Sequence, residues 1–564
     1  MQKFKDYQYQ RPNVDEIKIE LSSIKEQLTK EKGVVSVIEL VKKYFLIQDE
    51  LDTQGQLVSI RTSLDTTDEF YDQEQSFFDE VSPVLQGLFT DINKVIYQSE
   101  FKPQLIEAFG AHYFDQLKVS IESFSDEIIP LMIEENKLAS KQQKLVASAQ
   151  IEFEGGVYNL SQMAPFTQSL SRETRKQAQL VISNFFESIE SDIDDIYDNM
   201  VKVRHEMAQK LGYKNYVELG YQRLGRTDYN ASDVKSYREQ IKRDVVPVVE
   251  ELVKRKAKRL GITDLKSYDT ISFLSGNPTP KGDRDFLVNH AKTMYKELSK
   301  ETDEFFNFMV DSELLELDSK KGKAGGGYCT FIPSYKAPFI FANFNGTSHD
   351  VDVLTHEAGH AFQVYQARDF INPMQRFPGY EACEIHSMSM EFFAWPWMEL
   401  FFKEDKEKYY FSHLSGAISF LPYGALVDEF QHEVYENPQM TKEERKATWA
   451  RLEKVYLPSK DYGEDAFMKK GTYWYRQGHI FGSPFYYIDY TLAQVCAFQY
   501  WIRDHRNHEE AWKSYVDLCK LGGAYGFVEL MRRSNLNSPF VDGTIKQTIE
   551  PLKAFLDTID DTKL

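Results

Sequence analysis

The chain has 564 residues, and 67 lysines and arginines stand against 87 aspartates and glutamates, which gives a net charge of −20 at neutral pH. This excess of acid disfavours a nucleic-acid-binding protein or one that adheres to an anionic membrane, since both need a basic face. A hydrophobic fraction of 42% with 14% aromatic residues excludes a disordered chain.

The cysteines and the amino terminus predict a cytoplasmic protein. The 4 cysteines are scattered without any C-x-x-C pair, so they form neither a disulfide framework nor a thiolate metal site. The first 13 residues lack the apolar core of a secretory signal. No apolar run reaches the roughly 18 residues that a membrane-spanning helix needs. We therefore expect neither membrane nor nucleic acid as a partner.

The amino-terminal part of the chain shows the period of amphipathic helices. Within residues 13–150, apolar side chains recur at three- and four-residue steps, as they do at Val34, Ile38, Val41 and Phe45. Charged residues occupy the opposite face. This pattern predicts a series of helices that pack together through their apolar sides.

Two features follow this helical part. In residues 151–160, short apolar–polar alternations flank Gly155-Gly156, which predicts a β-hairpin because glycines accept positive φ with little strain. Beyond it, the stretch Arg172–Leu211 contains neither glycine nor proline, which favours long helices.

The helical pattern of the sequence is interrupted a second time at residues 320–350. Three consecutive glycines, Gly325–Gly327, are followed by two prolines and a run of aromatic residues, which ends the helical pattern. The segment Pro338–Phe344 then has the composition of a short β-strand. After Asp350 the helical period returns and continues, with interruptions, to the carboxyl end.

The sequence H-E-A-G-H at residues 356–360 is a candidate catalytic motif. On a helix, His356 and His360 lie one turn apart on the same face. Two imidazoles so placed can bind one zinc ion, and Glu357 then lies where it can take a proton from water.

A zinc ion held by two histidines needs a third protein ligand. The spacing H-E-x-x-H-x-x-G-x-x-H is excluded, because Gln363 and Gln366 stand where its glycine and last histidine belong. A carboxylate from a separate helix remains, and Glu381, Glu384 and Glu391 are available. We choose Glu384 as the ligand and Glu391, two turns further on, as the residue that orients an imidazole.

The segment 476–494, near the carboxyl end, carries His479, Tyr486, Tyr487 and Tyr490. Hydrolysis of a peptide at zinc develops negative charge on the carbonyl oxygen, and neutral donors near the metal lower that barrier. Tyrosine hydroxyls and an imidazole suit this task. Tyr487 and Tyr490 are three residues apart and share a helical face.

Together these motifs resemble the M3 zinc metallopeptidases, in particular the oligoendopeptidase F branch, which is related to thimet oligopeptidase. The resemblance is carried by LTHEAGHAF at 354–362, EIHSMSMEFF at 384–393 and HIFGSPFYYIDY at 479–490. A weaker likeness extends from residue 151 to the carboxyl end.

The resemblance implies one zinc ion per chain. By it, His356, His360 and Glu384 are the zinc ligands, and Glu357 is the general base.

It also implies that a histidine and two tyrosines stabilise the oxyanion and position the substrate. His479, Tyr487 and Tyr490 match these best, because the Tyr-x-x-Tyr step agrees. The segment after His479 is one residue shorter than in thimet oligopeptidase, which leaves Tyr486 as the alternative to Tyr487.

The fold implied by the resemblance is mainly helical, with two lobes about a deep channel and a small β-sheet beside the zinc helix. We expect residues 1–190 to form an amino-terminal helical domain with the hairpin near its end. Residues 191–564 are then the catalytic domain. An edge strand at 339–345 is expected to pair with an extended substrate backbone.

On this interpretation four residues bind substrate, and they are Phe341, Ala342, Asn343 and Tyr486. The expected activity is that of a zinc-dependent endopeptidase that cleaves internal bonds of short unfolded oligopeptides, because a deep channel excludes folded proteins. Three alternatives stay open: a dipeptidyl carboxypeptidase acting at substrate ends, a zinc-containing peptide-binding protein without catalysis, and a helical scaffold without metal.

Overall fold

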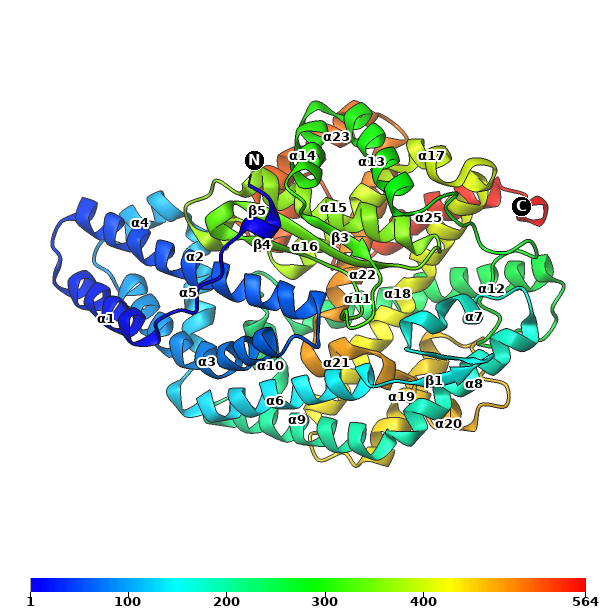
Figure 1. Cartoon of the computed structure of the whole chain (residues 1–564), viewed down its shortest axis with the longest axis horizontal. Helices are drawn as coiled ribbons and strands as arrows, with labels where there is room; N and C mark the ends of the chain where they lie inside the picture. Colours follow the sequence, from blue (N-terminus) through cyan, green and yellow to red (C-terminus); the bar gives the residue numbers. More distant parts are fainter. Residues whose placement is uncertain (1) are drawn as a thin grey trace.

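The amino-terminal helices pack around a small core of their own in the computed structural model, which describes residues 2–564. Val41 and Phe45, two positions predicted to face inward, are 0% and 2% exposed in this core. α1 begins after Asn13, whose side chain accepts a hydrogen bond from the Glu16 amide. The helices of this core, blue to cyan in Figure 1, are α1 (Val14–Lys30), α2 (Val34–Leu64), α3 (Glu69–Tyr97), α4 (Lys102–Phe109) and α5 (Ala111–Glu122). The next helix, α6 (Ile129–Ala147), packs against the large core of the rest of the chain instead.

The predicted hairpin is present, and its turn lies one residue earlier than expected. β1 (Ile151–Phe153) pairs antiparallel with β2 (Gly156–Tyr158). The two turn residues are Glu154 and Gly155, with φ of 43° and 82°. Gly156 already belongs to the second strand, so only one glycine of the pair supplies positive φ.

The stretch after the hairpin confirms the expected long helices, with a break at Ile189 between α8 and α9. α11 and α12 are joined by a short π-helical segment, Ile241–Val245. The elements of this part are α7 (Ala164–Thr167), α8 (Arg172–Ser188), α9 (Glu190–Lys210), α10 (Tyr216–Arg223), α11 (Ala231–Gln240), α12 (Val246–Leu260), α13 (Arg284–Leu298) and α14 (Lys300–Asp311).

A three-stranded sheet follows, and its order differs from our expectation. β5 (Ala337–Phe344) is the predicted strand, but it lies at the centre, between β3 (Leu315–Asp318) and β4 (Tyr328–Ile332). It is parallel to β3 and antiparallel to β4. The prediction of an edge strand at 339–345 is therefore wrong, because its backbone groups are bonded on both sides. The sequence pattern did not predict β3 or β4.

The carboxyl-terminal helices share one large apolar core with most of the middle of the chain. This core runs across residue 190, and the division there remains a prediction. In residues 2–564, no helix is long and apolar enough to cross a membrane. The helices are α15 (His349–Ala367), α16 (Tyr380–Phe393), α17 (Met398–Phe402), α18 (Lys406–Glu436), α19 (Lys442–Tyr456), α20 (Ala466–Lys469), α21 (Gly478–Gly482), α22 (Tyr487–Asp504), α23 (His508–Leu521), α24 (Phe527–Arg533) and α25 (Thr544–Asp557).

α15 and α16 approach each other closely at Gly359. A Cβ atom at this position would lie 2.6 Å from the carbonyl oxygen of His386 and 2.6 Å from the Cα of Ser387. Both atoms belong to the α16 backbone, so no side-chain rotation can relieve the overlap. The missing side chain of Gly359 thus sets the spacing of the two helices.

We expect Gly359→Ala to destabilise the protein by about 1–3 kcal/mol, because the added methyl group forces α15 and α16 apart. Chemical denaturation with far-UV circular dichroism measures this. Gly416→Ala is the matched control: a methyl group at Gly416, within α18, would meet no neighbouring atom and should add about 0.5–1 kcal/mol of stability. Equal stability of both variants would contradict the proposed constraint.

Candidate metal centre

α15 presents His356 and His360 on one face, with ring centroids 5.0 Å apart. The helix lies against β4 and β5. At its start, the carboxylate of Asp350 accepts hydrogen bonds from the amides of Asn345 and Gly346, which holds the preceding loop. The helix expected from the spacing of the histidines is therefore present and anchored.

α16 brings the Glu384 carboxylate to both imidazoles. Its Oε2 atom lies 3.2 Å from Nε2 of His356 and 3.3 Å from Nε2 of His360. One ligand atom of each residue can be chosen so that all three lie within 4.8 Å of one another. In a tetrahedral zinc site with bonds of about 2.0–2.1 Å, two ligand atoms are about 3.3 Å apart. The three residues thus fit such an ion.

The electrostatics of the three side chains favour a cation between them. Burial alone raises the pKa of Glu384, but the imidazoles of His360 and His356 outweigh it and hold that pKa well below its usual value. Burial lowers the pKa of His356, and hydrogen bonds to Glu384 and Glu391 reverse this and raise it well above normal. An ionised carboxylate beside proton-attracting imidazoles is a donor set for a divalent cation.

A second carboxylate, that of Glu391, orients the imidazole of His356 through its Nδ1 atom. Oε1 of Glu391 lies 2.7 Å from Nδ1 of His356, and Oε2 lies 2.7 Å from Nε2 of His413 on α18. With its Nδ1 bonded in this way, His356 turns Nε2 toward Glu384. This is the contact expected of Glu391; nothing in the sequence pointed to His413, which is a lone histidine on a long helix.

Glu357 lines a cavity of about 550 Å³ together with the three candidate ligands. Its side chain is 6% exposed. Burial raises the pKa of Glu357, and the neighbouring imidazoles of His356 and His360 oppose this. A carboxyl group with a raised pKa beside a cation site is suited to exchanging a proton with water.

The aromatic donors lie beside Glu384. The hydroxyl of Tyr486 donates to Oε1 of Glu384 at 2.6 Å, and Nε2 of His479 lies 3.3 Å from the Tyr490 hydroxyl. Tyr486 and Tyr490 line the cavity. Tyr487 does not line it, because its ring packs against Phe420 and Tyr423. Of the two alternatives, Tyr486 faces Glu384 and the cavity, whereas Tyr487, our choice, does not line the cavity.

Two of the expected substrate-binding residues do not reach the cavity. Phe341 and Ala342 are fully buried in the central strand β5. The Asn343 side chain donates to the carbonyl oxygens of Ala324 and Gly326, so it holds the glycine loop rather than a ligand.

The cavity is lined instead by the start of the edge strand β4, which sequence reasoning missed. Gly327, Tyr328, Cys329 and Thr330 all border it. At Gly327, an added Cβ would stand 3.6 Å from Oε1 of Glu357. The run of aromatic and β-branched residues after the three glycines, Tyr328–Ile332, could have predicted this strand.

Family models match most of the chain. The model described as the Peptidase M3 N-terminal domain matches residues 4–124, and the one for Peptidase family M3 matches residues 166–548. The chain belongs to peptidase family M3. It is therefore a peptidase of a metallopeptidase family, with peptides as its substrates.

Solved structures of similar chains agree with this membership. PZ peptidase A, solved with an inhibitor, is 49% identical, with a TM-score of 0.98 over 99% of this chain and 100% of that one. A putative oligoendopeptidase F from Bacillus anthracis str. Ames is 52% identical, with a TM-score of 0.94 over both full chains. Another putative oligoendopeptidase F is 48% identical, with a TM-score of 0.99 over both full chains. A comparison with curated proteins gives no match.

We expect Glu391→Gln to weaken metal binding to this M3 peptidase by about 10–100-fold, because an amide is a poorer partner for Nδ1 of His356. Competition with a chelating dye measures the affinity. Glu407→Gln, an exposed change on α18, is the control and should leave the affinity unchanged. The same affinity in both variants would show that Glu391 does not orient the ligand.

Proposed function

We propose that the chain is a zinc-dependent endopeptidase that hydrolyses internal bonds of short unfolded oligopeptides. The observation that carries this proposal is the convergence of His356, His360 and Glu384 within a cavity that also holds Glu357. The spacing of the three donors fits tetrahedral zinc, and two imidazoles with one carboxylate form a ligand set typical of catalytic zinc sites.

When bound, zinc supplies Lewis acidity that polarises a carbonyl group and lowers the pKa of water. Glu357 takes the proton from the attacking water and later gives it to the leaving amine. The raised pKa of Glu357 supports both transfers, since it brings the carboxyl group nearer to neutrality.

Tyr490 is proposed to donate a hydrogen bond to the developing oxyanion, with His479 holding its hydroxyl group. Burial lowers the pKa of His479, which keeps this imidazole neutral at physiological pH. Tyr486 is proposed to orient Glu384 and to contact the substrate. The ring of Tyr487 is proposed to support His479, against whose imidazole it packs.

The edge strand β4 is proposed to bind the substrate backbone in place of β5. Its residues Tyr328–Thr330 border the cavity beside Glu357, and in residues 2–564 it is paired on one side only. Backbone pairing gives affinity with little demand on substrate sequence. His112 and Gln116 of α5 line the same cavity, so both proposed domains, residues 1–190 and 191–564, border the site.

We expect Glu357→Gln to keep zinc but to lower kcat for peptide cleavage by roughly 10²–10⁴-fold, because the amide cannot accept the proton. Metal content by mass spectrometry and turnover of a quenched fluorescent peptide are the two readouts. Glu433→Gln is the matched control. Like Glu357, Glu433 directly follows a histidine in the chain, His432, but its carboxylate forms an ion pair with Arg451. Near-normal turnover by the Glu357 variant would falsify the assignment of the base.

The endopeptidase activity itself is tested with a peptide blocked at both ends. We expect the wild-type protein to cleave it at an internal bond, a chelator to abolish cleavage, and added zinc to restore it. Mass spectrometry identifies the products. Cleavage only of peptides with a free carboxyl end would favour an exopeptidase, and absence of both metal and cleavage would favour a scaffold.

A further inference from the structure

Lys323 lies in the loop between β3 and β4, residues 319–327, and its charged side chain is 0% exposed. Its amine donates hydrogen bonds to the carbonyl oxygens of Asp318 and Ala342, each at 2.6 Å, and of Glu316 at 3.2 Å. Burial lowers the pKa of Lys323 to about 8, against the attraction of the Glu316 carboxylate at 3.8 Å. The amine is therefore mostly protonated at neutral pH and has three hydrogens for these three bonds.

The bonds of Lys323 join the ends of two strands. β3 and β5 pair in parallel, but their register shifts between Glu316 and Asp318, which interrupts the regular pairing. Lys323 donates to the carbonyl oxygens of both these residues and to Ala342 on β5. Hydrogen bonds from a charged donor compensate for its burial. Lys323 thus attaches the loop to the sheet at this point.

Two further contacts hold the loop next to Lys323. Nδ2 of Asn343, on β5, donates to the carbonyl oxygens of Ala324 and Gly326 at 2.8 and 2.9 Å. On the side of α2, the amide of Ala324 donates to the carbonyl oxygen of Ser63 at 2.8 Å. The loop is therefore held both by the sheet and by a helix of the amino-terminal part of the chain.

The side chain of Lys323 is connected to the first residue of β4 through the ring of Phe341. Its nitrogen lies 4.5 Å from the centroid of that ring, and the ring of Tyr328 stacks on Phe341 with centroids 4.8 Å apart. Gly327, directly before Tyr328, lies so near the proposed base that an added Cβ would stand 3.6 Å from Oε1 of Glu357. Contacts of Lys323 therefore continue to the part of β4 that borders the cavity.

We propose that Lys323, together with Asn343, is a positioning residue for substrate binding, because it fixes the edge of β4 where a peptide backbone can pair with it beside Glu357. This inference rests on the proposed peptidase function and deepens it. Lys323 does not border the cavity, so it acts through β4 and not by contact with the substrate. An edge that is already fixed needs little ordering when a peptide binds, which favours affinity.

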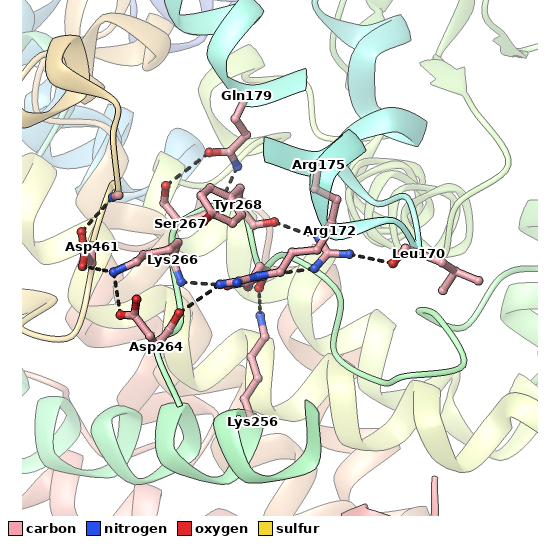
Figure 2. Close-up of polar contacts among 12 residues, drawn as sticks. Leu170, Arg172, Arg175, Gln179, Lys256, Asp264, Lys266, Ser267, Tyr268 and Asp461 are labelled. Atoms are coloured by element: carbon pink, nitrogen blue, oxygen red, sulfur yellow. Dashed lines mark hydrogen bonds and ion pairs between the residues drawn. The ribbon is translucent and has the colours of Figure 1, made fainter. Parts of the chain in front are cut away.

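Lys256 resembles Lys323 in its bonding but lies outside the metal centre. In Figure 2 it extends from α12 to a loop, where its amine donates to the carbonyl oxygen of Asp269. Burial lowers the pKa of Lys256 to about 8 as well. Because Lys256 does not border the cavity of the metal centre, Lys256→Met is a matched control. Lys320→Met is a second one, since it removes an exposed charge from the same loop and from the same partner, Glu316.

The test measures peptide binding by calorimetry in the Glu357→Gln background, in which a bound peptide is not cut. A parent peptide that contains the cleavage site is compared with analogues in which one backbone N–H is replaced by an ester oxygen, at successive positions. An analogue loses affinity where that N–H is hydrogen-bonded in the complex. Zinc content, kcat and KM are measured with proteins that retain Glu357.

We expect at least one ester analogue to bind the Glu357→Gln protein about five- to ten-fold more weakly than the parent peptide, because a backbone bond to β4 is lost. Adding Lys323→Met should weaken binding of the parent peptide about ten-fold and remove most of this ester effect, since both changes act on the same contact. Asn343→Ala should act in the same direction. With Glu357 present, KM should rise while zinc content and kcat stay within about two-fold. Lys256→Met and Lys320→Met should retain both the affinity and the ester effect.

Unchanged affinity for the parent peptide in the Lys323 and Asn343 variants overturns the proposal, as does an ester effect that keeps its full size in Lys323→Met. An equal loss of affinity in Lys256→Met would also overturn it, because any buried amine would then have the same effect. Asn343→Ala leaves the buried charge in place and decides the question if Lys323→Met does not fold. Peptide binding by the Glu357→Gln protein without any cleavage by the wild-type protein would refute the endopeptidase activity alone.

Discussion

The close contact of α15 and α16 at Gly359 is the constraint on which the metal centre depends. His356 and His360 lie on one helix and Glu384 on the other, so the three donors meet only when the two backbones approach to the distance that a glycine allows. A larger residue would displace one helix by more than the few tenths of an ångström that zinc geometry tolerates.

Around this contact, the buried charges are bonded in a chain that continues beyond the ligands. Glu391 bridges His356 and His413, while Tyr486 bonds Glu384. Unpaired, each of these buried groups would cost several kcal/mol. Because they bond one another, the donors are held in position before any ion arrives, and little free energy is spent on ordering them when it binds.

The sequence by itself predicted the helical class, the helix that carries His356, Glu357 and His360, and the helical face shared by Glu384 and Glu391, because these depend on spacing within single helices and on the chemistry of residue types. It could not determine that β5 is central, that β4 borders the cavity, or that Tyr486 rather than Tyr487 faces Glu384. Adjacent tyrosines at the start of a helix differ by about 100° in direction, and only packing against α18 decides which one turns inward. Strand order and the pairing of Glu391 with His413 likewise arise from contacts between segments far apart in the chain, which local periodicity does not record.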